Sequence, residues 1–215
     1  MKRRTLDITF SVVGLALAGL LLVLGLVLQN QANFADSYVK HQLSQQQITF
    51  TPVDKLAPEE QKAACLVKNE GQPLTTGKQA ECYANKYIGL HVTEVNDGKT
   101  YSQTSGESRA LQAQLAAAQA ADPTSAETVA LQQQADELSG KVDTLFRGET
   151  LRGLLLTSYG FSIFGDRAQQ AAWVSFAAAF VLFLASIAGF IHAFTTKKDE
   201  QVAPTEPRQR VGADS

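Results

Sequence analysis

Two long stretches of the chain consist almost entirely of apolar side chains. Residues 8–28 contain no charged side chain, and neither do residues 171–194. At about 1.5 Å per helical residue, each stretch is long enough to cross a hydrocarbon core of roughly 30 Å. The pattern predicts two transmembrane helices, at 8–28 and 171–194, on either side of a polar segment of residues 29–170.

The helical pattern continues beyond the first span. Apolar side chains recur between Phe34 and Leu43, and neither glycine nor proline interrupts them. The first helix is therefore expected to extend into water as a stalk over residues 29–44. Residues 45–51 are expected to form a short strand or an extended passage that ends at Pro52.

Two further helices are expected within residues 52–95, over residues 58–67 and 77–95. Pro58 suits a first helical position, and Thr76 with Gln79 has the spacing of a capping box. The second helix carries apolar side chains at steps of three and four, which we interpret as the core side of the domain. These residues are Ala80, Tyr83, Ala84, Tyr87, Ile88, Val92 and Val95.

A helical hairpin is expected over residues 107–145. Its first helix ends near Ala121, and its second begins at Pro123 behind an Asp122 cap. Apolar residues of the second helix alternate steps of four and three, the spacing of a coiled-coil seam. They are Leu131, Ala135, Leu138, Val142 and Leu145. Because two repeats are few, a loosely packed and mobile hairpin is the alternative.

The segment before the second span, residues 146–170, combines leucine and aromatic side chains with arginines. One interpretation is an interfacial helix and turn whose aromatic side chains lie at the bilayer surface. Those side chains are Tyr159, Phe161, Phe164 and Trp173. The other interpretation is that residues 151–156 pack on Tyr83 and Tyr87 in the domain core.

Basic residues flank the outer ends of both spans. Lys2, Arg3 and Arg4 precede the first, and Lys197 and Lys198 follow the second. The segment between the spans holds 12 basic and 16 acidic residues. By the positive-inside rule, both termini are expected in the cytoplasm and the central domain outside it.

The ends of the chain carry two further expectations. Residues 195–215 contain Pro204 and Pro207 and almost no apolar side chain, so this cytoplasmic tail is expected to be disordered. A cleaved signal peptide is the alternative for residues 1–28. Its apolar core would typically be about 7 to 15 residues, and the longer stretch here favours an uncleaved anchor.

Cys65 and Cys82 are the only cysteines of the chain, and both fall in helices expected outside the membrane. An oxidising compartment favours a disulfide between them. The bridge would close a loop of about 18 residues, for which chain entropy predicts about 3 kcal/mol of stabilisation.

Small residues recur four positions apart in both spans, where they allow helix backbones to approach closely. They are Gly14, Ala18, Ser175, Ala179, Ala185 and Gly189. We predict them to be helix contacts, with lipid-facing filler as the alternative. Neither span contains an acid, lysine or arginine, which argues against an ion path formed by this chain alone.

Candidate chemistry is sparse. Ser37 and Lys40 match a Ser-x-x-Lys pattern, but the companion motifs of the acyl enzymes that use it are missing, so an envelope hydrolase is the weakest hypothesis. His91 beside Glu94 is best explained as a surface pair. We therefore expect no catalytic residue, cofactor, metal or nucleotide site, and 19 basic against 21 acidic residues give no surplus for nucleic acid.

Residues 91–102 (HVTEVNDGKTYS) and 146–159 (FRGETLRGLLLTSY), lying between two spans, resemble a family of two-pass membrane proteins of actinobacteria. Most members of that family are uncharacterised. Small two-pass proteins of this kind also resemble accessory subunits of the actinobacterial cytochrome bc and oxidase supercomplex. The resemblance implies an accessory or assembly subunit of a larger membrane complex.

The fold expected from these patterns is mainly α, with two transmembrane helices flanking an extracytoplasmic helical domain that has one disulfide and a helical hairpin. The expected partners are the lipid bilayer and a larger integral membrane complex. A different function remains open, namely an extracytoplasmic module that binds a lipid, a quinone or an envelope ligand. That ligand would lie between Tyr83, Tyr87 and Ile88 on one side and residues 151–164 on the other.

Overall fold

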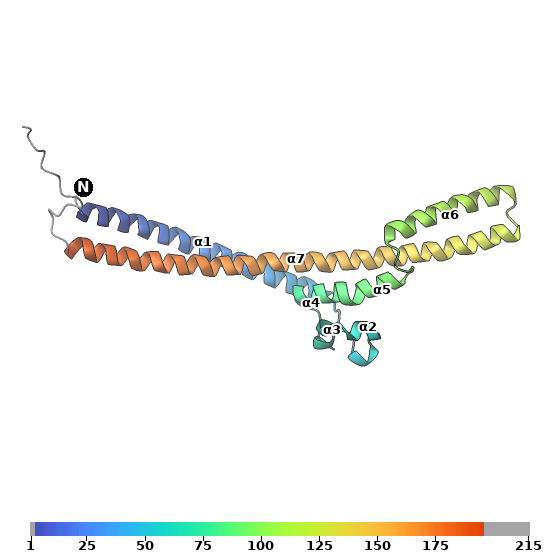
Figure 1. Ribbon diagram of the computed structural model, residues 1–215, viewed down its shortest axis with the longest axis horizontal. Coiled ribbons are helices and arrows are strands. Elements are labelled where there is room, and N and C mark those ends of the chain that lie inside the picture. Colours follow the sequence, from blue (N-terminus) through green and yellow to red (C-terminus); the bar gives the residue numbers. More distant parts are fainter. Residues whose placement is uncertain (1–2, 196–215) are drawn as a thin grey trace, which may run out of the picture. The chain divides into compact units, whose positions relative to one another are not determined.

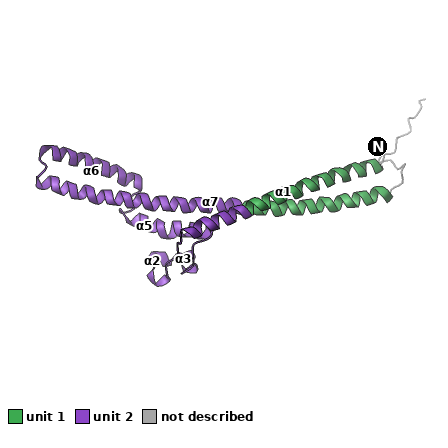
Figure 2. Ribbon diagram, turned by 180° about the vertical axis from the view of Figure 1, so that it is seen from behind, with its two compact units in different colours: residues 1–32, 166–215 green, residues 33–165 purple. Residues whose placement is uncertain are grey.

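The computed structural model describes residues 3–195. Of the tail expected to be disordered, Thr195 is helical, and residues 196–215 lie outside the described range. The described residues form helices and no β-strand, which confirms the mainly α prediction. They divide into two compact units (Figure 2). Unit 1 contains described residues up to Ala32 together with those from Asp166 onward, and unit 2 contains residues Asn33–Gly165.

Two long helices contain the apolar stretches (Figure 1). Helix α1 runs over Arg3–Gln45, so the helix of the first apolar stretch does continue over the predicted stalk. Helix α7 runs over Ala126–Thr195 without a break. The turn considered for residues 146–170 is therefore absent, because no proline lies between Pro123 and Pro204 to remove a helical hydrogen bond.

Unit 2 holds the short elements of the chain. After α1, residue Gln47 adopts a positive φ of 51° and Thr49 forms a single antiparallel bridge with Pro73, so this passage is extended. The elements that follow are the 3-10 helix η1 (Val53–Lys55), α2 (Pro58–Gln61), α3 (Ala64–Lys68), α4 (Gly77–Cys82), the π-helix η2 (Tyr83–Ile88) and α5 (Gly89–Glu94).

The helix predicted over residues 58–67 is in fact two short helices. Ala63 between them is extended, with φ −82° and ψ 96°. The Gln61 amide donates to the carbonyl oxygens of Val53 and Leu56, which ties the end of α2 back to the preceding turn. The sequence pattern does not signal the break at Ala63.

The segment predicted as one helix over residues 77–95 is helical from Gly77 to Glu94, with a π-helical turn in its middle. Its capping box is confirmed, because the Gln79 backbone N–H donates to the Thr76 hydroxyl and the Thr76 N–H donates to the Gln79 side chain. The amphipathic stripe reaches the core of unit 2 as expected, with Ala80, Ala84 and Ile88 buried.

The hairpin consists of α6 (Tyr101–Ala121) and the first part of α7. Helix α6 begins six residues earlier than predicted because Thr100 and Gln103 form a capping box. Helix α7 begins at Ala126 and not at Pro123, because the Ser125 hydroxyl accepts the Thr128 N–H as its cap. Asp122 instead holds the turn, where hydrogen bonds from the Thr124 N–H and hydroxyl lower the pKa of its carboxyl group.

A single hydrophobic core lies in unit 2. It joins α1, the short elements and α7, so that segments distant in sequence share one interior. Its largest fully buried apolar side chains are Phe50, Leu66, Leu74 and Leu145. Leu155 is buried in the same core and Leu156 packs against it, whereas Leu151 and Leu154 are exposed, so the second of the two interpretations holds for only part of residues 151–156.

Candidate interaction surfaces

In unit 1 the two apolar helices pack through serine and glycine. The Ser11 side chain lies against Gly189, and the Ser186 side chain lies against Gly14, so a Cβ atom at either glycine would collide with a hydroxyl group. The serine comes from α1 in one contact and from α7 in the other. Both contacts let the two backbones approach closely.

Five of the six small residues predicted as helix contacts are buried or face the opposite helix, and one is exposed. Ala18, Ser175 and Ala179 are buried, and Gly14 and Gly189 face the serines of the opposite helix. Ala185 is exposed. The small residues thus serve mainly to pack α1 against α7 within the chain.

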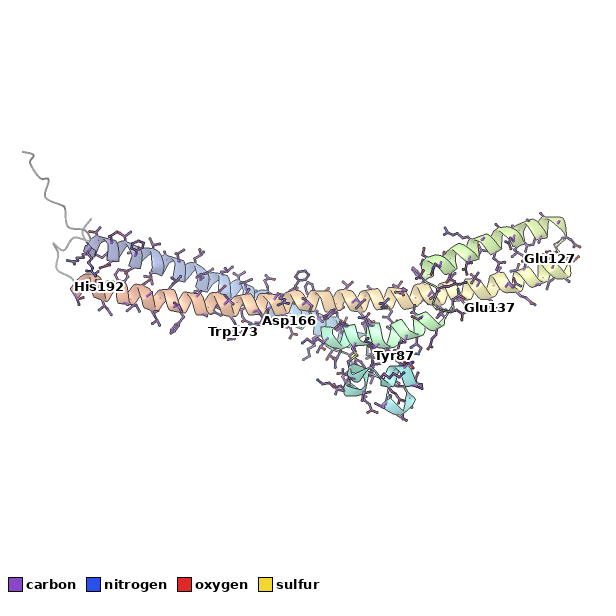
Figure 3. All side chains as sticks on the ribbon, viewed as in Figure 1. Tyr87, Glu127, Glu137, Asp166, Trp173 and His192 are labelled. Atoms are coloured by element: carbon purple, nitrogen blue, oxygen red, sulfur yellow. A yellow bond between two sulfur atoms is a disulfide. The ribbon has the colours of Figure 1, made fainter. Side chains whose placement is uncertain are left out.

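Polar pairs join α1 and α7 at both ends of the apolar section of unit 1. The Gln29 and Gln169 side-chain amides donate to each other's oxygen at 2.6 Å. At the other end the His192 Nδ1 lies 2.9 Å from the Asp7 carboxylate (His192 is labelled in Figure 3). From Asp7 to Gln29 a helix rises by about 33 Å, which is close to the thickness of a hydrocarbon core.

The outer surface of this section is apolar. Both α1 and α7 contain a window that is long and apolar enough to cross a membrane, and only 17% of each window is buried. Trp173, also labelled in Figure 3, is among the exposed side chains and contacts Phe176 edge to face. A core helix of a water-soluble protein would bury most of such a window.

One hollow in this apolar surface lies between the two helices, and we name it the span groove. Its volume is about 630 Å³. Gly19 lies open to it, since no atom comes within 4 Å of the place where a Cβ would stand. The groove is lined by Leu15, Ala18, Gly19, Leu22, Phe176, Ala179, Phe180 and Phe183.

Unit 2 contains a row of four ring side chains. Ring centroids lie 5.4 Å apart between Phe50 and Tyr83, 4.7 Å between Tyr83 and Tyr87, and 4.6 Å between Tyr87 and His91. Tyr87 is labelled in Figure 3. Burial raises the pKa of Tyr83 to about 12, and the neighbouring Tyr87 and Glu60 add to this effect.

His91 pairs with a residue that is distant in sequence. Its Nδ1 lies 3.0 Å from the Tyr87 carbonyl oxygen, to which it must donate, and 3.3 Å from Oε1 of the buried Glu60. The other Glu60 oxygen accepts the Ala57 N–H at 2.8 Å. The pair thus links α2 to α5, in contrast to the local pairing with Glu94 considered from the sequence.

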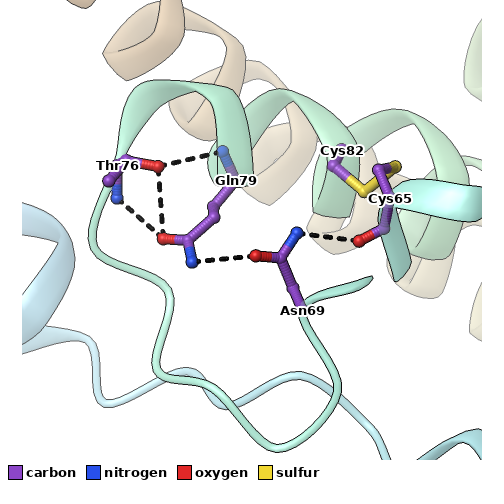
Figure 4. Close-up of a disulfide and its surroundings, with 5 residues drawn as sticks. All are labelled: Cys65, Asn69, Thr76, Gln79 and Cys82. Atoms are coloured by element: carbon purple, nitrogen blue, oxygen red, sulfur yellow. Dashed lines mark hydrogen bonds between the residues drawn. A yellow bond between two sulfur atoms is a disulfide. The ribbon is translucent and has the colours of Figure 1, made fainter. Parts of the chain in front are cut away.

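The predicted disulfide between Cys65 and Cys82 is confirmed, with their Cα atoms 6.1 Å apart (Figure 4). Asn69 supports it by donating to the Cys65 carbonyl at 2.7 Å while accepting from the Gln79 amide at 3.1 Å. The disulfide and this amide chain fasten α3 to α4.

An exposed aromatic and leucine surface lies on α1 and α7 within unit 2. The Tyr38 ring lies 5.7 Å from Phe34 and 5.8 Å from Phe161. We name this surface the aromatic face, and its exposed members are Phe34, Tyr38, Leu151, Leu154 and Phe161. Of the predicted interface residues, Phe161 belongs to it. Phe164 is exposed elsewhere on α7, Trp173 is exposed in unit 1, and Tyr159 is partly buried with its backbone near Gly77.

Ser37 and Lys40, the hypothetical catalytic pair, are both exposed on the surface of α1, and the structure adds no support for their catalytic role. Among residues 3–195, no three histidine, cysteine or acidic side chains lie close enough together to hold a metal ion.

No family model, curated protein or solved structure matches the chain. The surfaces of the two units are therefore the features from which a function can be inferred.

Proposed function

We propose that this chain is a two-pass membrane protein that serves, without catalysis of its own, as an accessory or assembly subunit of a larger membrane complex. The span groove is the observation that carries the proposal. It is apolar, and Gly19 in its lining leaves room for a close neighbour, since no atom comes within 4 Å of the place where its Cβ would stand. Within a bilayer, small residues of this kind let the backbone of another helix approach.

The polar pairs support the membrane placement. Asp7–His192 and Gln29–Gln169 are separated by about the thickness of a hydrocarbon core, and the surface between them is apolar. Arg3 and Arg4 precede Asp7, so the positive-inside rule assigns that end to the cytoplasm. Unit 2 would then lie outside the cytoplasm, where its disulfide would persist.

The topology has its own test. Protease added to sealed cells should digest residues 29–170, while a reporter fused after Ser215 should stay protected. Protection of the central segment together with export of the reporter would contradict the arrangement.

The first complex to examine is the cytochrome bc and oxidase supercomplex, because residues 91–102 and 146–159 resemble actinobacterial two-pass proteins. The chain would be purified from its membranes in a mild detergent, and co-purifying proteins would be identified by mass spectrometry. A large membrane complex should be recovered in constant proportion to the chain.

A matched pair of variants tests whether the span groove binds that complex. Gly19→Leu fills the groove, whereas Ala185→Leu introduces the same side chain at an exposed position outside it. Gly19→Leu should abolish co-purification and Ala185→Leu should retain it, with equal membrane insertion of both. Retention of the complex by Gly19→Leu, or a wild-type chain purified without any partner, would contradict the proposal.

Binding of a lipid, a quinone or an envelope ligand is the second candidate. This function requires an open space between the Tyr83 stripe and residues 151–164. Ile88 and Leu155 lie in that region and are both buried in the core of unit 2. We rank this function second for that reason.

A further inference from the structure

The aromatic face exposes a large apolar surface. The exposed fractions are 56% for Phe34, 49% for Tyr38, 40% for Leu151, 62% for Leu154 and 38% for Phe161. All five residues belong to unit 2, outside the section bracketed by the two polar pairs. An apolar patch of this extent is often a binding surface.

The spacing along α7 indicates what kind of partner the face fits. Leu151, Leu154, Ser158 and Phe161 follow one another at steps of three, four and three residues. This is the a/d spacing with which one helix packs against another in a coiled coil. A lipid tail would require no such period, so the spacing favours a helix as the occupant.

A hollow in the same face provides the complementary shape. Its volume is about 370 Å³, and its lining includes Tyr38, Leu151, Leu154, Ser158 and Phe161. The lining contains leucine, valine, aromatic, amide and hydroxyl side chains and no charged one. An uncharged surface can meet a copy of itself without repulsion, whereas a strongly charged one cannot.

The exposed area reaches the lower limit for a specific pair. At about 200 Å² for a large side chain, the five exposed fractions correspond to roughly 500 Å² per chain. Two such faces would bury about 1,000 Å², which is the area expected of a small specific interface.

From these observations we propose that two copies of this chain pair through the aromatic face. The pair is two-fold symmetric, with the α7 helices parallel and the leucine and phenylalanine side chains of each copy entering the hollow of the other. Two copies inserted in the same direction into one membrane meet this requirement. The inference shares the two-pass placement with the proposed function but uses a different surface from the span groove.

Cysteine crosslinking in native membranes tests the pairing. The native cysteines are bonded to each other, so a single added cysteine supplies the reactive thiol. Ser158→Cys lies on the seam and should meet its own copy, giving a covalent dimer after mild oxidation. Gly153→Cys is exposed on the same helix but off the seam, and it should remain monomeric.

The molar mass of the chain in mild detergent supplies a second measurement. Wild-type protein should have twice the mass of Leu154→Glu, because Leu154→Glu brings two carboxylates together on the seam. Leu154→Glu should also remove the crosslink formed by Ser158→Cys. It should still co-purify with the larger complex that is proposed to bind the span groove at Gly19. The two results together separate this inference from the proposed function.

Three outcomes would overturn the pairing. These are equal crosslinking at both cysteine positions, a crosslink from Ser158→Cys to a different protein, and a monomeric wild-type chain whether or not it carries bound lipid.

Discussion

The two units hold their helices together in opposite ways. Unit 1 places small side chains between its helices, with Ser11 against Gly189 and Ser186 against Gly14, and its large apolar side chains point outward. Unit 2 buries large side chains such as Phe50 and Leu74 and adds a disulfide. The two units thus rely mainly on different devices, although unit 2 also has one serine–glycine contact, Ser162 against Gly77, and unit 1 has one large ring, Phe176, against Gly25.

The difference is the one expected from the proposed placement of unit 1 in a bilayer and unit 2 in water. Burial of large apolar groups stabilises a fold only when the alternative is exposure to water. In a bilayer that gain disappears, and close contact between backbones takes its place. We therefore expect cavities and bond reduction to weaken unit 2, and added bulk between the helices to weaken unit 1.

The largest expected effect is that of a cavity in unit 2. Phe50→Ala removes a side chain that is 1% exposed, and it should lower the free energy of unfolding of unit 2 by about 3–5 kcal/mol. Phe146→Ala, at an exposed position, should cost about 1 kcal/mol or less. Denaturant titration followed by circular dichroism would measure both, and equal costs would contradict the assignment of the core.

Loss of the disulfide should have the next largest effect. Cys65→Ala combined with Cys82→Ala should destabilise unit 2 by about 3 kcal/mol, because the unfolded chain regains the freedom of the loop. Hydrogen exchange over residues 77–94 would report the change. A reducing agent should reproduce it in the wild type and have no effect on the double variant, while fluorescence of Trp173 in unit 1 should stay constant.

A smaller effect is expected from bulk in unit 1. In Gly189→Leu the new side chain meets Ser11, so the helices must separate, at a cost of about 1–3 kcal/mol. Unfolding in detergent followed by Trp173 fluorescence would measure it. Adding Ser11→Gly to Gly189→Leu should restore part of the lost stability of unit 1. Ala185→Leu should leave that stability nearly unchanged. If Ser11→Gly restores none of it, the serine–glycine contact is not the cause of the loss.

The smallest expected effect concerns pH. An unfolded tyrosine has a pKa of about 10, whereas that of Tyr83 in the folded chain is about 12. The neutral phenol is thus favoured by folding, and its contribution to stability is fully present below pH 10 and is lost as the pH rises through 12. Urea unfolding at alkaline pH should show this loss in the wild type and a smaller one in Tyr83→Phe, with Tyr101→Phe as the control.

Much of the fold was predictable because it depends on local patterns. The apolar stretches, the Thr76–Gln79 capping box and the pairing of Cys65 with Cys82 all follow from residue type and spacing. The π-helical turn and the break at Ala63 were not predictable, because no proline, glycine or capping pattern in the sequence marks either of them. The early start of α6 was missed although Thr100 and Gln103 carry its signal.

The interaction surfaces were predictable only in part. Spacing identified Gly14, Ala18 and Gly189 as small residues in the spans, but it did not distinguish the side that packs within the chain from the side that stays open at Gly19. The aromatic face combines Phe34 and Tyr38 with residues more than a hundred positions later, and no local pattern joins them. The Glu60–His91 pair was missed for the same reason.

The wide turn at Tyr83–Ile88 has a consequence for changes in chain length. A π-helical turn holds a surplus residue compared with an α-helix of the same rise. Deleting that residue, for instance Asn85, would convert the turn to α and leave the residues on either side of it in register. Deleting one residue from the regular part of α5, for instance Leu90, would instead rotate everything downstream by about 100° around the axis. His91 would then leave Glu60 and Val92 would leave the interior, so the wide turn is the one place in this segment where the domain should tolerate the loss of a residue.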